Sequence, residues 1–168
     1  MKPIASPAEL YAHAIAIERE AAGRYAELAE RMSDRDNEAV AEVFGRLAQL
    51  EAEHLDALLQ RTAGIALPAF SENDYRWLDV GAPETAAREL VFRLMTARQA
   101  LAIALRAEQR AQAFFEGVMM SADDPALRAL AREMALEEQE HAAMIERLLE
   151  STPEPWVDWA SVYERSPG

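Results

Sequence analysis

Apolar residues recur at intervals of three and four along four long segments of the chain, and polar residues occupy the positions between them. This is the period of an amphipathic helix that buries one face. Helix-start signals precede three of the segments, because Ser6 and Thr96 each open a capping box and Asp124 stands before a proline. The pattern therefore predicts four helices of similar length, over residues 7–32, 37–61, 97–120 and 125–150.

The connections between these helices differ greatly in length. Those from the first to the second and from the third to the fourth are only a few residues, so each pair forms antiparallel neighbours. The segment 62–96 is long enough to travel the height of a bundle, which makes the second and third helices parallel. This is the ferritin-like topology of an all-α four-helix bundle. We expect residues 1–150 to form the bundle and residues 151–168 to be an aromatic tail packed on it or on a partner.

Composition and charge narrow the possible functions. The 168 residues include 17 Lys and Arg against 30 Asp and Glu, a formal net charge of −13, which disfavours nucleic-acid and anionic membrane partners. The absence of cysteine excludes a disulfide and a rubredoxin-type electron-transfer module on this chain. With no signal-peptide pattern and no membrane-spanning run, we expect a cytoplasmic protein. An apolar patch left on one bundle favours association as a homodimer.

Six polar residues interrupt the apolar faces near the middle of the four predicted helices. Two helices carry a lone Glu each, and the other two carry a Glu-x-x-His motif, whose residues share one face of a helix. The six candidates are Glu18, Glu51, His54, Glu108, Glu138 and His141. The third histidine, His13, lies off the apolar faces, and we expect it to be exposed or in an interface.

Four carboxylates in the core of a bundle need a compensating charge, because an unpaired buried carboxylate is costly or becomes protonated. Two divalent cations would neutralise four carboxylates. A donor set of four carboxylates and two imidazoles favours iron or manganese over structural zinc. The sequence therefore predicts a centre of two metal ions in the middle of the bundle.

This pattern resembles the ligand set of ferritin-like di-iron carboxylate proteins, most closely the rubrerythrin family, over residues from about 5 to 150. The resemblance implies two iron ions, with manganese or substituting zinc as alternatives. It also implies a role for each ligand: Glu51 and Glu138 bridge the two metals, Glu18 and His54 complete one site, and Glu108 and His141 complete the other.

Two further positions bear on the chemistry. Tyr25 matches a tyrosine in the first helix of the family, which implies a hydrogen bond beside the metals and a catalytic role; simple core packing is the alternative. Ala111 stands where the family has another carboxylate that exchanges with a histidine on iron oxidation, so this exchange is not expected here.

The resemblance implies an oxidoreductase that reduces peroxide or dioxygen with electrons from a separate donor. A ferroxidase or iron-handling protein, or a metal-stabilised structural bundle, is the alternative.

Overall fold

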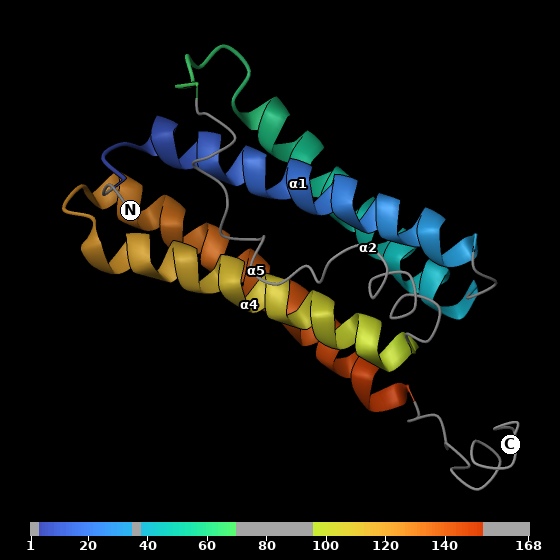
Figure 1. Ribbon diagram of the computed structural model, residues 1–168. Coiled ribbons are helices and arrows are strands. Elements are labelled where there is room, and N and C mark those ends of the chain that lie inside the picture. The colour runs from blue at the N-terminus through green and yellow to red at the C-terminus, as the bar shows by residue number, and fades with distance from the viewer. Residues whose placement is uncertain (1–3, 35–37, 70–95, 153–168) are drawn as a thin grey trace, which may run out of the picture.

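The computed structural model describes residues 4–34, 38–69 and 96–152, which form four long helices (Figure 1). The helices are α1 (Pro7–Ser33), α2 (Glu38–Arg61), α4 (Ala97–Ser121) and α5 (Pro125–Ser151). Each end lies within one residue of the position expected from the caps and turns, which confirms the prediction of four long helices.

Side chains at the helix starts explain why the ends could be located so closely. The Ser6 hydroxyl accepts a hydrogen bond of 3.2 Å from the backbone N–H of Glu9 at the start of α1. At the start of α4, Thr96 and Gln99 each accept a hydrogen bond from the other's backbone N–H, at 3.2 Å and 2.9 Å. Asp124 caps α5 through its side chain. These bonds satisfy N–H groups that a first helical turn leaves without partners.

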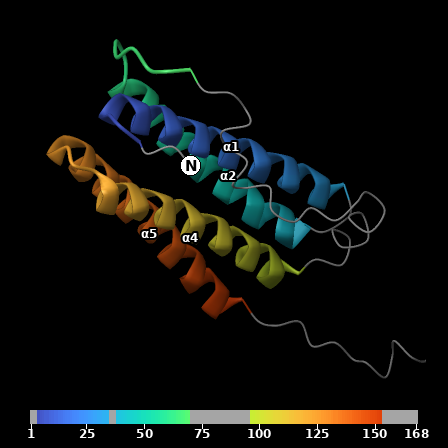
Figure 2. The same cartoon turned by 60° about the vertical axis from the view of Figure 1, so that its left-hand side comes forward.

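The helices form two antiparallel hairpins, α1 with α2 and α4 with α5, stacked as two layers (Figure 2). The layers approach each other through α1 with α5 and through α2 with α4. Helices α2 and α4 run in the same direction, as the colours of Figure 1 show, which confirms the ferritin-like topology. Residues 70–95 of the expected crossover and residues 153–168 of the expected aromatic tail lie outside the described residues. None of the helices in the described ranges is long and apolar enough to span a bilayer.

The core consists of two apolar clusters, one toward each end of the bundle. One cluster includes Leu10 and Phe115, and the other includes Phe44 and Ile145. Each of the four helices contributes to both clusters. Between the clusters lies a layer made by the six candidate residues of the sequence, which we call the polar layer. The fold therefore places carboxylate and imidazole groups at mid-height, between two bodies of apolar packing.

Candidate metal centre

Five of the six residues of the polar layer are buried. The carboxyl-bearing residues Glu18, Glu51, Glu108 and Glu138, together with His141, expose only 2% to 5% of their surface. His54 is partly exposed. Ionisable side chains are seldom buried to this degree unless they have partners. The cluster is therefore part of the core and is not a set of surface charges.

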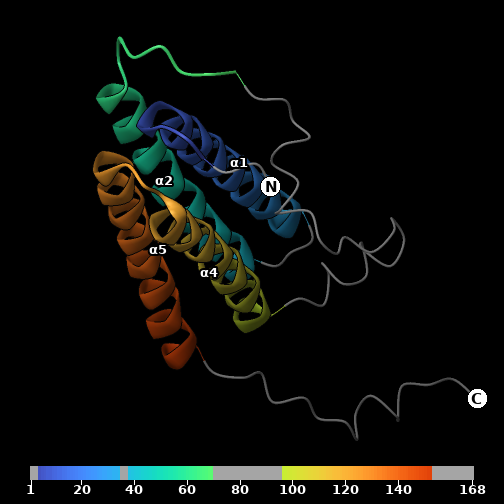
Figure 3. The same cartoon turned by 90° about the vertical axis from the view of Figure 1, so that its left-hand side faces the viewer.

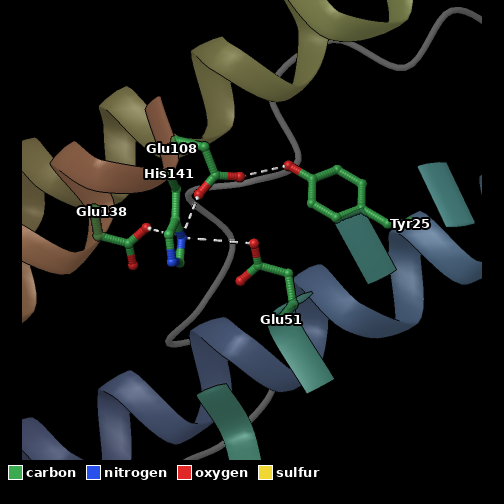
Figure 4. Close-up of polar contacts among 5 residues, drawn as sticks. All are labelled: Tyr25, Glu51, Glu108, Glu138 and His141. Carbon is green, nitrogen blue, oxygen red and sulfur yellow. Dashed lines mark hydrogen bonds and ion pairs between the residues drawn. The ribbon is translucent and has the colours of Figure 1, made fainter. Parts of the chain in front are cut away.

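His141 is the point on which the carboxylates converge (Figure 4). Its Nδ1 atom lies 3.3 Å from Glu108 Oε2, 3.5 Å from Glu138 Oε2 and 3.7 Å from Glu51 Oε1. These partners come from α4, α5 and α2, so both hairpins contribute to one cluster. The spacing of the Glu-x-x-His motif in α5 puts Glu138 and His141 on one face, as the sequence indicated.

His54 faces His141 across the boundary between α2 and α5. The two imidazole rings are stacked, with centroids 4.3 Å apart and planes inclined by 20°. The donor atoms of Glu51, His54 and His141 all lie within 4.8 Å of one another, and the same holds for those of Glu108, Glu138 and His141. Each set of three offers the oxygen and nitrogen donors of a metal site.

These groupings differ in part from the pairing that the resemblance implied. Glu108 and His141 fall in one set, and Glu51 and His54 fall together in the other, as expected. Glu18 belongs to neither set, although its carboxyl group is buried and interacts electrostatically with that of Glu51. The structure therefore brings five of the six residues together in two sets of donors that share His141, and Glu18 is buried next to Glu51 outside both sets.

Burial dominates the electrostatics of the carboxyl groups. Loss of solvation raises the pKa of Glu18 to about 7, that of Glu138 to about 8 and that of Glu51 to about 10. Neighbouring carboxylates add to each increase, because like charges in a low-dielectric core repel. In the absence of a cation, protons are therefore held among these groups at neutral pH.

The two imidazoles respond in opposite directions. Burial alone would lower the pKa of His141, but hydrogen bonds to Glu108 and Glu138 and the charge of Glu51 raise it to about 11. Burial and the nearby charge of His141 lower the pKa of His54. His141 therefore acts as the internal counter-charge of the carboxylates, whereas His54 stays neutral and able to bind a metal at neutral pH.

Unpaired atoms test whether metal ions fit this cluster. Glu18 Oε2, Glu51 Oε1 and His141 Nε2 are fully buried and have no hydrogen-bond partner among the described residues. Buried polar atoms without a partner are rare in folded proteins, and each one calls for an explanation. All three are metal-donor atoms within one cluster, so divalent cations would satisfy them while displacing the protons. The residues present fit a pair of metal ions.

Tyr25 combines the two roles that the sequence left open. Its hydroxyl group donates a hydrogen bond of 2.8 Å to Glu108 Oε1, and its ring stacks on Phe44 with centroids 5.9 Å apart. Burial and the charge of Glu108 raise the pKa of Tyr25 well above its usual value. The phenol is therefore protonated at any physiological pH and fixes one oxygen of Glu108.

A small cavity beside the cluster was not predicted from the sequence. It has a volume of about 20 Å³ and lies against Tyr25 and Glu108, with Ala21, Ala107 and Ala111 forming part of its wall. This space is sufficient for one water molecule. The substitution of alanine for the family's additional carboxylate at position 111 thus leaves room next to the candidate ligands. The signal in the sequence was a set of small residues on two helices, which periodicity alone did not reveal.

His13 is not exposed, contrary to the expectation from the sequence. It retains only 8% exposure, and its ring centroid lies 5.7 Å from that of Phe114. The neighbouring residues Ala12, Ala14 and Ile15 are also buried, so α1 is covered around almost its whole circumference at this level. The prediction that α1 buries a single apolar face was therefore wrong at this level, where the buried surface extends further around the helix.

Comparisons with known proteins agree with the fold. The rubrerythrin family model matches residues 9–67, which carry Glu18, Glu51 and His54. The crystal structure of an uncharacterised conserved protein from Magnetospirillum magnetotacticum is 34% identical, with a TM-score of 0.73, over 90% of this chain and 99% of that chain. The comparison with curated proteins gives no match. The molecule is a ferritin-like four-helix bundle with a carboxylate and histidine cluster that could bind metal. Within that class, the chain belongs to the rubrerythrin-like proteins.

Proposed function

We propose that this protein is a di-iron oxidoreductase that reduces hydrogen peroxide or dioxygen. The observation that carries the proposal is the buried convergence of Glu51, Glu108, Glu138 and His141, which form a donor set suited to iron between two apolar clusters. In this proposal Glu18, Glu51, His54, Glu108, Glu138 and His141 hold two metal ions. By the ligand pattern that the sequence resembles, Glu51 and Glu138 would be the ligands shared by the two ions.

The residues of this chain would each have a distinct task. When bound, a ferrous pair supplies the two electrons that, with two protons, convert hydrogen peroxide into two water molecules. The four carboxylates balance the charge of the metals inside a low-dielectric core. Tyr25 fixes Glu108 through its hydrogen bond, and the cavity beside them offers space for a small molecule. The apolar clusters on both sides keep bulk water away from the centre.

Electrons for repeated turnover must come from outside the cluster. The sequence has no cysteine and hence no iron–sulfur ligand on this chain. We therefore propose that a separate electron-donor protein supplies them. A formal net charge of −13 favours a donor with a basic docking surface.

Anaerobic loading followed by single turnover tests this function. The metal-free protein is loaded with two equivalents of ferrous iron and mixed with hydrogen peroxide or with air-saturated buffer in a stopped-flow instrument. We expect a ferric absorption band to form rapidly, with both ions still bound after desalting. A protein that binds two ions and reacts with neither oxidant would be a metal-stabilised structural bundle, and the proposed activity would be wrong.

Iron handling is a second candidate, favoured by the partial exposure of His54. In that function dioxygen or peroxide would accept electrons from ferrous iron held at the centre, and the ferric product would be released for storage or transport. The two candidates differ in the fate of the product. Retention of ferric iron through repeated cycles of reduction and oxidation supports the oxidoreductase, whereas loss of iron after each oxidation supports iron handling.

A further inference from the structure

The polar layer is accessible from one side. Glu18, Glu51, Glu108, Glu138 and His141 are buried, and His54 alone among the six residues is partly exposed. His54 belongs to α2 and stacks on His141 of α5. A cation that comes from solvent therefore meets the cluster where side chains of α2 and α5 meet; Figure 3 shows how these two helices are arranged in the bundle.

Two contacts join α2 to α5, and we call the surface between them the α2–α5 strip. At one level His54 stacks on His141, and about two turns away Arg61 binds Glu133 through both of its terminal nitrogens, with Nη2 and Oε2 2.8 Å apart. Arg61 follows His54 on α2, whereas Glu133 precedes His141 on α5, so the helices run antiparallel along the strip.

Glu137 lies on the strip between these two contacts. It is four residues after Glu133 and four residues before His141, and residues four apart share one face of a helix. Its side chain is exposed, and it has no hydrogen bond or ion pair within the described part of the chain. Arg61, the nearby cation, is already bound to Glu133. An unpaired carboxylate thus stands one helical turn from a buried imidazole whose Nε2 atom has no partner.

We propose that divalent metal ions enter and leave the centre along this α2–α5 strip, with Glu137 as a transient ligand between solvent and His54. The proposal rests on the proposed function, because it requires the polar layer to bind metal. A hydrated cation loses much solvation energy on entering a core, and a carboxylate on the way replaces its water molecules in steps. Glu53 and Glu140, both exposed and within electrostatic range of His54, add negative potential at the entrance.

The test is the rate of metal uptake by the metal-free protein, measured with cobalt(II) as the probe. The visible absorption of bound cobalt is followed by stopped flow for the wild type, for Glu137→Gln and for the control Glu146→Gln. Glu146 is exposed on α5 but, five residues after His141, lies on a different face, so both variants lose one negative charge from the same helix. Release is measured in parallel by adding an excess of a chelator.

We expect Glu137→Gln to slow both uptake and release by about 3- to 10-fold, with an unchanged final stoichiometry and dissociation constant, because a transient ligand changes the barrier and not the end state. The control should stay within about twofold of the wild type, as expected for a screened surface charge.

Two results would overturn the proposal. Equal rates for Glu137→Gln and the control would remove Glu137 from the route. A weaker dissociation constant with unchanged uptake would make Glu137 a permanent ligand instead. Failure of the wild type to bind cobalt at all would have a separate meaning, because it would refute the metal centre of the proposed function and the route together.

Discussion

The hydroxyl group of Tyr25 on α1 donates a hydrogen bond to Glu108 on α4, at a distance of 2.8 Å. The other oxygen of this carboxylate lies 3.3 Å from His141 Nδ1. Glu108 is therefore held at both oxygens by residues of two other helices, and its orientation does not depend on metal. A carboxylate oriented in advance loses little conformational freedom when it binds a cation.

Replacing Tyr25 with Phe should slow oxidation without removing the metals. The variant keeps the ring that stacks on Phe44 and loses the hydroxyl group alone. We expect two metals per chain and a decrease of about 10- to 100-fold in the single-turnover rate, as is typical when a ligand loses its hydrogen-bond partner. Metal analysis and stopped-flow oxidation measure the two quantities. Tyr11→Phe, a change beneath Arg61 and away from the polar layer, is the matched control and should leave the rate unaltered.

Replacing either proposed bridging residue should abolish the reaction with peroxide. Glu51→Ala or Glu138→Ala removes a ligand shared by both ions and one negative charge from the core, so both metals should be weakened. We expect fewer than two metals per chain and no ferric band in single turnover. Glu146→Ala on the exposed face of α5 should behave as the wild type. Bridge variants that hold two metals and react at the parent rate would place the chemistry elsewhere.

Stability of the protein stripped of metal should decrease as the pH rises. Glu18, Glu138 and Glu51 have folded-state pKa values raised from 4.5 to about 7, 8 and 10, so the folded state binds more protons than the unfolded chain. Their stabilising contribution is complete below pH 4.5 and is lost as the pH rises through the folded-state values. His141, raised from 6.5 to about 11, acts in the same direction above pH 6.5.

Thermal unfolding measured between about pH 5.5 and about pH 8.5 checks this expectation. The Tm of the metal-free protein should fall across the range, and that of the metal-loaded protein should change less, because bound cations replace the protons. If the Tm of the metal-free protein rose with pH instead, the folded state could not bind more protons than the unfolded chain, and the prediction would be wrong.

A homodimer is the expected assembly. The C-terminal ends of α2 and α4 lie at the same end of the bundle, and Met120 there is 84% exposed, with Leu59 and Ile65 also exposed. Light scattering should give twice the chain mass of 18.7 kDa, or 37.4 kDa, over a range of concentrations. Met120→Ser should weaken the association if this end forms the contact. A mass that stays at 18.7 kDa at all concentrations would show a monomer.

The sequence was sufficient for the helices because local chemistry sets their ends. Ser6, Thr96 and Asp124 each cap a helix with their own side chains, so the bounds needed no tertiary information. The burial of Glu18 and Glu108 also followed from position, since each interrupts an otherwise apolar face in mid-helix.

The features that the sequence did not reveal depend on how each of the four helices is oriented about its own axis relative to the others. The stacking of His54 on His141, the place of Glu18 outside both donor sets and the burial of His13 are all relations between helices. Periodicity gives the face of one helix but not the partner that it meets. The cavity beside Ala111 has the same origin, because an empty space is a property of several helices together.

The division of the core into two apolar clusters has a consequence for how the molecule unfolds. Each cluster is the core of a half-length bundle, and the polar layer between them places ionisable side chains where apolar packing would otherwise continue. The continuous helices are then the main link between the halves, so either end can open while the other stays folded. Bound cations would join the halves across all four helices, and they would convert two loosely linked folding units into one cooperative unit.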